Sequence, residues 1–514
     1  MDNHADADWR AQIFRELKMT SLTQDGRVPF LNNGGVKRLL IGGQWVEAIS
    51  GETFDSINPA TGKVIATLAK GGAADIDSAV KAARLAFEGP WSKWTPFDRQ
   101  NLLLKIADLI ERDFEELSLI ETMDMGAPVS RTSLFKRWLL QAFRFYAAQA
   151  VNIRGETLEN SFPGSFMSYT VKDPVGVVGC IIPWNGPLIS QLWSICPTLA
   201  TGCTLVLKPA QEASLSSLRL AEIMLEAGVP AGVINVVTGG GQTAGSALAA
   251  HPDVDKIAFT GSTETGRKIV EASAVNMKKV AVELGGKSPD IIFEDADLDL
   301  AVPGAAMGCF GNSGQVCYAG TRLFVQRSIH DAFVEKLAAF TATLRVGDSL
   351  KPETQLGPLV SKAQLETVAG YVELAQQEGA RIAFGGERLG GALADGFYFA
   401  PTVLAGVSNT MRVAQEEIFG PVISIIPFDD EEEVIGLANA IEYGLGGAVW
   451  TRDVGRAHRV SRAIKAGIVW VNCYGVTDPS TSYGGTKLSG YGSKGGFRHI
   501  EDYLYSKTVW IRTA

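Results

Sequence analysis

The sequence predicts an α/β protein made of two alternating strand–helix units, and three observations carry that prediction. The chain has 514 residues, which is too long for one ordinary hydrophobic core. Hydrophobic residues make up 46% of it and charged residues 20%, as in ordinary globular proteins. Short β-rich apolar runs alternate with helical patterns, which is typical of a parallel sheet covered by helices on both faces.

Residues 1 to about 37 form a separate N-terminal extension. Four apolar residues, Trp9, Ile13, Phe14 and Leu17, predict one short amphipathic helix, which we interpret as part of a surface or subunit-contact arm. The first ten residues are acidic and have neither the apolar core of a secretory signal nor the arginines of a transit peptide. We therefore expect a cytosolic location.

Two amphipathic helices are expected next. From about residue 74 apolar side chains recur at helical spacing, at Ile76, Val80, Ala83 and Phe87. A second set repeats this pattern further along the chain, at Leu103, Ile106, Leu109, Ile110, Phe114 and Leu117. Both patterns predict helices that pack one face against a core.

The first sheet is predicted by five short apolar runs, at residues 175–182, 204–207, 233–237, 257–259 and 280–282. A helix is expected between the second and third runs, at residues 215–226, where Ser214 could cap its start and Gly228 could end it. Sheets of this kind bind ligands at the carboxyl ends of their strands.

A second alternation of strands and helices runs from about Asp331 to Asn472 and predicts a second α/β unit. Residues 154–171 predict an extended, hairpin-like insertion, and residues 503–511 predict a further strand near the C-terminus.

Charge and hydropathy exclude several classes of partner. The formal net charge is −9 and no Lys/Arg cluster is present, so a nucleic-acid partner is not expected. The most apolar stretch, residues 175–184, is too short to cross a membrane and is interrupted by Gly179 and Pro183. Six cysteines without a CxxC pair fit reduced thiols, and five isolated histidines predict no metal site.

Three motifs carry candidate chemistry, and each also has a plain structural interpretation. Residues 259–266 follow an expected strand and open an expected helix, so their N–H groups could hold a phosphate, although the spacing matches neither GxGxxG nor a P-loop. Glu283 ends a strand just before two glycines, where α/β proteins place catalytic groups, yet most glutamates are surface residues. Cys317 follows a glycine-containing segment, residues 311–316, and is a candidate nucleophile, yet most free cysteines are small buried apolar residues.

Together these motifs resemble the aldehyde dehydrogenase superfamily, over nearly the whole chain from about Leu39 onward. Further matching segments are residues 183–185, 208–210 and 417–421, Asn472, and residues 483–490. The resemblance implies a Rossmann-like cofactor domain, an α/β catalytic domain and a small β oligomerisation arm. The implied boundaries are an N-terminal extension at 1–37, a dinucleotide-binding domain at 38–152 and 175–285, a catalytic domain at 286–497, and an arm at 153–174 and 498–514.

The resemblance implies a covalent mechanism. Cys317 would attack the aldehyde carbonyl, and the Asn185 side-chain amide, with the Cys317 N–H, would hold the resulting oxyanion. After hydride transfer to the nicotinamide, Glu283 would activate the water that hydrolyses the thioester. A carboxylic acid is the implied product.

The cofactor implied by the resemblance is NAD, with NADP left open. Where NAD-preferring members carry a glutamate, this chain has Gln211. A carboxylate accepts hydrogen bonds from both ribose hydroxyls and repels a 2′-phosphate, and an amide does both less strongly. The residues expected to bind the cofactor are Ile182, Trp184, Lys208, Gln211, Gly261, Ser262, Glu417 and Phe419.

The substrate entrance is implied only by the resemblance. Gly186 and Ser190 would leave extra room, and no arginine obviously anchors a carboxylate, so we expect a bulky apolar or aromatic aldehyde rather than a semialdehyde acid. A homodimer or homotetramer is the expected assembly. The residues expected to line the entrance are Trp138, Trp193, Tyr318, Tyr474 and Tyr483.

One position departs from the family pattern. Ser493 and Lys494 stand where relatives carry an Arg-Glu pair, so a proton relay through that second glutamate is missing.

Three alternative functions stay open. A CoA-acylating enzyme would keep the thioester, although Glu283 as a base for water disfavours it. A non-catalytic protein on the same fold is disfavoured by the joint presence of the three reactive groups. A P-loop hydrolase is disfavoured because residues 261–268 lack the GK[ST] ending, and residues 285–288 lack the glycine that the motif needs at position 281.

Overall fold

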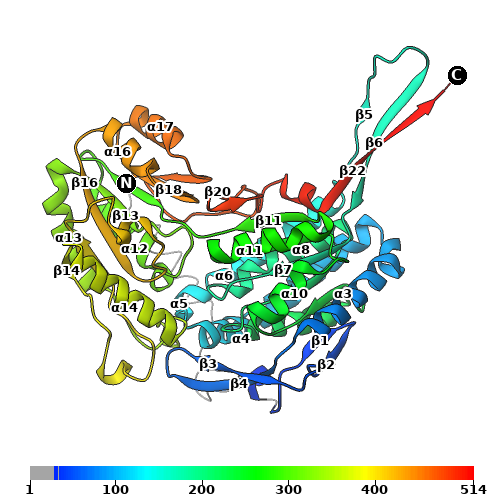
Figure 1. Ribbon diagram of the computed structural model, residues 1–514, viewed down its shortest axis with the longest axis horizontal. Coiled ribbons are helices and arrows are strands. Elements are labelled where there is room, and N and C mark those ends of the chain that lie inside the picture. The colour runs from blue at the N-terminus through cyan, green and yellow to red at the C-terminus, as the bar shows by residue number, and fades with distance from the viewer. Residues whose placement is uncertain (1–27, 33, 514) are drawn as a thin grey trace.

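A computed structural model provides the structure of the chain and describes residues 28–32 and 34–513. Two sheets with their covering helices form two lobes, and a three-stranded arm projects from one of them (Figure 1). The predicted α/β class is confirmed. The short helix expected around Trp9 to Leu17 lies outside the described residues.

The first sheet has eight strands, of which five central ones are parallel. These five are the strands that the apolar runs predict, and their bounds differ from the predicted ones by at most a few residues. Antiparallel strands close both edges. In order across the sheet the strands are β2(Gln44–Val46), β1(Leu39–Ile41), β9(Ile234–Val236), β8(Thr204–Lys208), β7(Val177–Ile181), β10(Lys256–Thr260), β11(Lys279–Glu283) and β21(Gly490–Tyr491).

Helices cover both faces of this sheet. Successive side chains of a strand point to opposite faces, and in β8 Leu205 and Leu207 belong to one hydrophobic cluster while Val206 belongs to another, so both faces are buried. The two amphipathic helices expected near residues 74 and 103 are present as α3 and α4. The covering helices are α3(Ala73–Glu88), α4(Pro96–Met125), α6(Phe135–Ala150), α8(Leu192–Thr201), α9(Leu215–Ala227), α10(Ser246–Ala250) and α11(Thr263–Ser273).

The ends of α9 confirm one prediction and correct another. Gly228 ends the helix in the left-handed conformation, with φ of 99°, as predicted. Ser214 does not cap the start, because its hydroxyl donates to the Ala210 carbonyl instead. The cap comes from α4, where the Asp124 carboxylate accepts a 2.7 Å hydrogen bond from the Leu215 N–H.

The second sheet has seven strands, six of them parallel, with β14 antiparallel at one edge. The expected start of this unit near Asp331 is wrong, because β12 and β13 already belong to the sheet before that residue. In order the strands are β14(Arg381–Phe384), β15(Thr402–Ala405), β16(Val422–Phe428), β13(Arg322–Gln326), β12(Pro289–Ile292), β18(Gly446–Trp450) and β19(Ile468–Val471). Its principal helices are α12(Leu298–Phe310), α13(His330–Ala342), α14(Lys362–Gln377), α16(Glu431–Asn439) and α17(Val454–Ala463).

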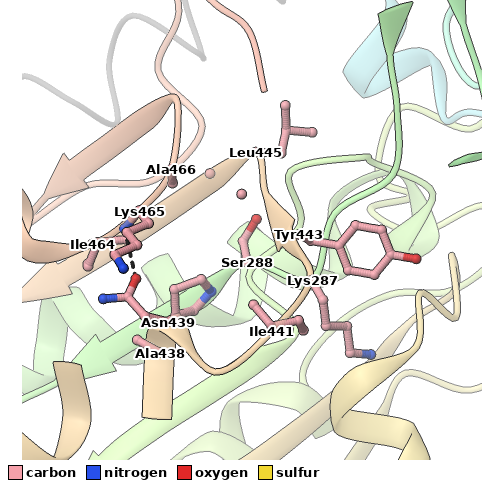
Figure 2. A pocket seen from close by; sticks show the side chains of 13 residues that line it. Lys287, Ser288, Ala438, Asn439, Ile441, Tyr443, Leu445, Ile464, Lys465 and Ala466 are labelled. Carbon is pink, nitrogen blue, oxygen red and sulfur yellow. Dashed lines mark hydrogen bonds between the residues drawn. The ribbon is translucent and has the colours of Figure 1, made fainter. Parts of the chain in front are cut away.

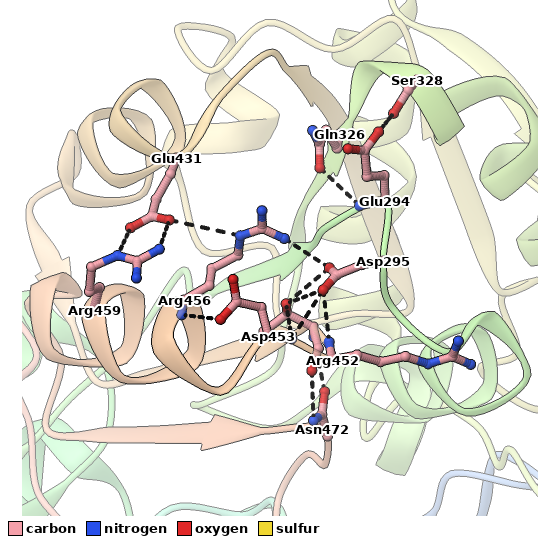
Figure 3. Close-up of polar contacts among 11 residues, drawn as sticks. Glu294, Asp295, Gln326, Ser328, Glu431, Arg452, Asp453, Arg456, Arg459 and Asn472 are labelled. Carbon is pink, nitrogen blue, oxygen red and sulfur yellow. Dashed lines mark hydrogen bonds and ion pairs between the residues drawn. The ribbon is translucent and has the colours of Figure 1, made fainter.

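Polar contacts hold α17 against the ends of β12 and β18 (Figure 3). The Asp295 carboxylate accepts from the Thr451 hydroxyl and, at 2.9 Å, from the Arg456 guanidinium. The Asn472 side chain bonds both backbone groups of Thr451. Glu431 on α16 pairs with Arg459, so the two helices and the sheet edge share one network.

The arm consists of three antiparallel strands, β5(Thr157–Leu158), β6(Phe166–Pro174) and β22(Leu504–Arg512). The expected hairpin-like insertion and the expected C-terminal strand are therefore confirmed, and they pair with each other along nine positions. The remaining regular elements are short, and include β3(Thr53–Asn58), β4(Lys63–Ala69), α2(Pro29–Asn32), α5(Val129–Thr132), α7(Pro187–Ser190), α15(Arg412–Gln415), β17(Tyr443–Gly444) and β20(Thr486–Lys487). Among the described helices, none combines the length and apolar character that a bilayer crossing requires.

Two buried carboxyl groups on α4 tie together the elements that lead to the site. Glu121 accepts hydrogen bonds from the Leu188 N–H in α7 and the Ser216 hydroxyl in α9. Asp124 accepts from the Ser56 hydroxyl at 2.6 Å as well as from Leu215. Burial raises the pKa of Asp124 to about 7 and that of Glu121 to about 8.

Replacing Asp124 by alanine is expected to lower the free energy of unfolding by about 1–3 kcal/mol. The change leaves the buried Leu215 N–H and Ser56 hydroxyl without an acceptor, which costs about that much. Chemical denaturation followed by circular dichroism measures it. Asp108→Ala is the control, because Asp108 lies on the same helix with its side chain 74% exposed. Equal stability of the two variants would contradict the capping role.

Candidate active site

The site lies where the chain crosses from the first sheet to the second. Glu283 is the last residue of β11 and Pro289 is the first residue of β12, so one short connection joins the two sheets. The glycines of this connection allow two other segments to approach. A Cβ on Gly286 would lie 2.5 Å from the Cys317 carbonyl oxygen, and a Cβ on Gly285 would overlap the Glu417 carboxylate.

The loop that carries Cys317 has an unusual backbone. It follows α12 through a short helical segment, η4(Gly311–Gly314), in which Asn312 and Ser313 both have φ of 55°. The conformation is sparsely populated by residues other than glycine and is held by surrounding contacts. Gln315 supplies several of these, since its amide donates to the Asn312 carbonyl and accepts from the Val360 N–H at 2.9 Å.

Asn185 is bonded to this loop in both directions. Its side-chain nitrogen donates to the Gln315 carbonyl at 2.9 Å, and its own carbonyl accepts from the Asn312 side chain at 3.2 Å. An amide nitrogen has two hydrogens, so the second one of Asn185 is free to donate elsewhere. The Cys317 N–H makes no hydrogen bond within the described part of the chain. Two potential donors for an oxyanion therefore lie together, one on the Cys317 loop and the other on the segment after β7 that is bonded to it.

Cys317 is partly exposed as a residue, and its sulfur lies 3.2 Å from the Tyr483 hydroxyl oxygen. Burial raises its pKa to about 11, with Glu283 and Glu417 adding to the rise, while Tyr483 and Lys494 oppose it. A thiol with this pKa is almost entirely protonated at neutral pH, so a base has to take its proton before it can act as a nucleophile.

Glu283 has the properties of such a base. It is 4% exposed, and neither of its carboxylate oxygens has a hydrogen-bond partner in the described structure. Burial raises its pKa to about 7, while the charge of Lys494 and, to a smaller extent, the nearby Gly485 N–H oppose that rise. A carboxyl group that titrates near neutral pH exchanges protons in both directions under ordinary conditions.

Lys494 is part of this cluster, although the sequence indicated it only as a departure from relatives. Its ammonium donates to the Thr260 hydroxyl at 2.6 Å, and Thr260 pairs with Glu283 in the register of β10 and β11. Desolvation lowers its pKa, while Glu283 and Cys317 raise it. The signal that could have identified it was a lysine two residues after the Gly490–Tyr491–Gly492 segment.

The residues expected to bind the cofactor lie at the carboxyl ends of neighbouring strands. Ile182 follows β7, and its N–H donates to the carbonyl of Lys208, the last residue of β8. Lys208 is 3% exposed, its ammonium makes no hydrogen bond within the described residues, and burial lowers its pKa to about 8. Gln211 lies beside Gly240: a Cβ added to Gly240 would be 3.7 Å from the side-chain oxygen of Gln211.

The motif at residues 259–266 has the predicted strand–turn–helix context. β10 ends at Thr260, and Ser262 caps α11 by accepting a 3.3 Å hydrogen bond from the Thr265 N–H. The Gly261 N–H donates to the Glu283 carbonyl. The loop thus presents the amino end of an 11-residue helix next to the strand that carries Glu283, which favours an anionic ligand there.

Glu417 and Phe419 come from the second lobe and meet the first. Glu417 accepts from the Gly286 N–H at 3.1 Å, and burial raises its pKa to about 7. Phe419 has φ of 56°, which is rare for an aromatic residue, and its ring meets Trp184 edge-on at 5.2 Å. Gln364 donates to the Phe419 carbonyl and holds this conformation.

The five aromatic residues expected at the substrate entrance form two groups. Tyr318 and Tyr483 lie at Cys317 with their rings 6.1 Å apart. Tyr474 packs on Gly308 and Gly320 and donates to the Tyr318 carbonyl, so it supports the first group. Trp138 and Trp193 form an edge-on pair at 4.8 Å, and Trp193 contacts Gly495, next to Lys494.

A small cavity in the second lobe is separate from this cluster (Figure 2). Its walls include Lys287, Ser288, Asn439, Tyr443 and Lys465, and none of the residues predicted to act in catalysis. The Lys287 ammonium has no hydrogen-bond partner, and burial lowers its pKa to about 7. Across residues 28–32 and 34–513, no group of three His, Cys, Asp or Glu could hold a metal ion.

Comparison with known proteins places the chain in a well-populated group. A profile described as "Aldehyde dehydrogenase family" matches residues 45–509. The protein DhaS of Bacillus subtilis is 47% identical over 479 residues, which cover 93% of this chain and 96% of that protein. The crystal structure of Staphylococcus aureus betaine aldehyde dehydrogenase with NAD+ gives a TM-score of 0.94 at 40% identity, covering 96% of this chain and 98% of that one. An NAD+ complex of Bacillus cereus aldehyde dehydrogenase gives 0.92 at 44% identity, with 94% and 98% covered.

Replacing Tyr483 by phenylalanine is expected to raise the pKa of the Cys317 thiol. The hydroxyl is the hydrogen-bond donor that stabilises the thiolate, and a shift of one pKa unit would slow alkylation roughly tenfold at a fixed pH. The rate of iodoacetamide labelling at Cys317, read by peptide mass spectrometry from neutral to alkaline pH, measures the shift. Tyr491→Phe is the control because Tyr491 is 50% exposed on β21. An alkylation profile unchanged by Tyr483→Phe would remove Tyr483 from the site.

Proposed function

Because the chain belongs to the aldehyde dehydrogenase family, we propose that it oxidises an aldehyde to a carboxylic acid through a thioester on Cys317. One observation carries the assignment of roles. The free N–H groups of Asn185 and Cys317, the Cys317 thiol and the near-neutral Glu283 all gather at the connection between the two sheets.

The first step is attack of the Cys317 sulfur on the aldehyde carbonyl. Glu283 takes the thiol proton, which its pKa of about 7 allows at neutral pH. The oxyanion that forms accepts hydrogen bonds from the second amide hydrogen of Asn185 and from the Cys317 N–H. These donors are held by the loop itself, so little reorganisation is needed as the charge develops.

The dinucleotide fits the residues at the strand ends. Lys208 is a buried ammonium without a hydrogen-bond partner, which suits a ribose hydroxyl, and the start of α11 at Ser262 suits the pyrophosphate. Ile182, Trp184, Gln211 and Gly261 complete this side, while Glu417 and Phe419 close the other. When bound, NAD+ supplies the acceptor for the hydride. The two related crystal structures contain NAD+, which supports NAD+ as the cofactor of this chain. NADP+ is the alternative, because Gln211 carries no negative charge to repel a 2′-phosphate.

The second half of the reaction is hydrolysis of the thioester. Glu283, ionised again after passing the first proton to solvent, accepts a proton from the water that attacks the acyl carbon, and Cys317 leaves as a thiolate that the second proton neutralises. A CoA-dependent second half is disfavoured because a thiol acceptor has no need of this base. A non-catalytic role on the same fold is disfavoured because all three reactive groups are present.

The proposed substrate is a bulky apolar or aromatic aldehyde. Support comes from the aromatic rings of Tyr318 and Tyr483 at the thiol and from the Trp138–Trp193 pair. One observation favours an aldehyde acid as the second candidate. Arg131 makes no side-chain hydrogen bond in the described structure, and its guanidinium lies near Gly311, where the Cys317 loop begins.

The domain boundaries inferred from the resemblance, the assembly and the location are part of the same proposal. Dimers or tetramers would form through the arm, whose strands β6 and β22 expose Met167, Trp510 and Ile511. A reducing compartment such as the cytoplasm is supported by the six cysteines, all described and all unpaired.

Replacing Glu283 by glutamine is expected to lower steady-state turnover about 10²- to 10⁴-fold, the usual loss of a general base. The first burst of NADH, up to one equivalent per site, should be slowed as well, because the same glutamate takes the thiol proton before the attack. Stopped-flow absorbance with an excess of aldehyde records both phases. Glu335→Gln, an exposed position on α13, is the control. Undiminished turnover would remove Glu283 from the mechanism.

In the unsubstituted enzyme, turnover is expected to decrease as the pH falls through about 7. Glu283 acts in its ionised form, and burial places its pKa at about 7, so protonation below that value removes the base. A pH profile of kcat at saturating aldehyde and NAD+ measures this limb. A flat profile between mildly acidic and mildly alkaline pH would contradict the assignment.

A panel of aldehydes crossed with NAD+ and NADP+ tests the substrate class. We expect kcat/KM for benzaldehyde-like and long aliphatic aldehydes to exceed that for succinate-semialdehyde-like ones by about tenfold or more. Cys317→Ala is the blank, because loss of the nucleophile abolishes covalent turnover. A preference for the aldehyde acid that Arg131→Met abolishes would overturn the apolar assignment in favour of the second candidate.

A further inference from the structure

The segment from Tyr483 to Lys494 folds over the end of β11 and covers Glu283. β21 pairs with β11, with Gly490 opposite Glu283. Tyr483 and Lys494, at the two ends of the segment, exchange backbone hydrogen bonds of 2.7 and 2.6 Å. A Cβ on Gly484 would lie 3.2 Å from a Glu283 carboxylate oxygen. The segment thus brings one residue to the thiol and another to the carboxylate.

Lys494 is fixed by two independent contacts. Its backbone is paired with Tyr483, whose hydroxyl lies 3.2 Å from the Cys317 sulfur. Its ammonium donates to the Thr260 hydroxyl at 2.6 Å. Because Thr260 and Glu283 are partners in adjacent parallel strands, their side chains leave the sheet on the same face, about 5 Å apart. The ammonium is therefore held beside the carboxylate without a contact ion pair.

Few other charges act on this pair. The titratable groups that face Glu283 are Lys494, the Cys317 thiol and the Tyr483 phenol. Those that face Lys494 are Glu283, Cys317, the buried Cys180 thiol and His499. Burial raises the pKa of both thiols and lowers that of His499, so these three are neutral at neutral pH. Lys494 is thus the cation that offsets the charge of Glu283.

We propose that Lys494 is a positioning residue for Glu283: its ammonium, anchored on Thr260, keeps the carboxylate ionised beside Cys317. Without that ammonium, burial would favour the protonated form of Glu283, because among the described residues the Gly485 N–H is the smaller of the two groups that lower its pKa. The same charge favours the thiolate of Cys317. This inference rests on the proposed role of Glu283 as the base, and it gives Lys494 a function in the active site.

The test is a graded series at position 494, compared by the pH dependence of kcat. Lys494→Gln should move the acidic limb of the profile upward by about one pH unit, a tenfold loss of rate at a fixed pH on that limb. Lys494→Glu, which puts a like charge beside Glu283, should move it further. Lys494→Arg keeps the charge and should restore the limb to its original pH, whatever its maximal rate. Lys487→Gln is the matched control, because that lysine lies on the same segment and bonds the Asn439 and Ile441 carbonyls instead.

A second readout does not depend on turnover. Iodoacetamide labelling of Cys317 in the free protein should shift to higher pH in Lys494→Gln and Lys494→Glu, and not in Lys494→Arg. If the enzyme without substitutions oxidised no aldehyde, the proposed function would fail while the labelling series still decided the role of Lys494. A purely structural lysine would lower kcat equally at every pH and leave both pH profiles in place. That result, or an equal shift in Lys494→Arg, would overturn the proposal.

Discussion

The whole site depends on the close approach that Gly285 and Gly286 permit. These glycines follow Glu283 after one intervening residue, Leu284, and a side chain on either one would collide with Glu417 or with the Cys317 carbonyl. The connection between the two sheets therefore brings a carboxylate from the first lobe, a thiol from the second and a further carboxylate into one small volume. Burial in that volume then moves the pKa values of all three groups upward, which couples their chemistry to their placement.

Most of the first lobe could be predicted from the sequence, because its strands are buried on both faces and read as continuous apolar runs. The beginning of the second sheet could not, because β12 has only four residues and includes the buried Asp290, which interrupts the apolar signal. The first residue of α9, Leu215, is predicted correctly, but its capping contact is not, since the cap is Asp124, far away in sequence on another helix. Local residues such as Gly228 report local backbone geometry, whereas contacts between distant segments leave no periodic pattern.

The candidate site also has a part that the sequence predicts and a part that it does not. Glu283 and Cys317 stand out because glycine-rich turns surround them, and the family resemblance adds Asn185 and the residues at the strand ends. The environment of each group could not be read from the chain. The sequence shows a lysine at position 494, but its place beside Thr260 and Glu283 follows from the pairing of β21 with β11. Likewise, Tyr474 is one of five expected aromatic residues, yet its hydroxyl is bonded to the Tyr318 carbonyl.

The high pKa of Cys317 also bears on how long the enzyme survives in a cell. Thiolates react with peroxides and adventitious electrophiles far faster than thiols do, and over-oxidation to sulfinic or sulfonic acid is not reversed by ordinary reductants. A nucleophile that stays protonated until a neighbouring base removes its proton is exposed to such damage for only a small fraction of the time. The same burial that slows activation of the sulfur thus protects it from oxidation between turnovers.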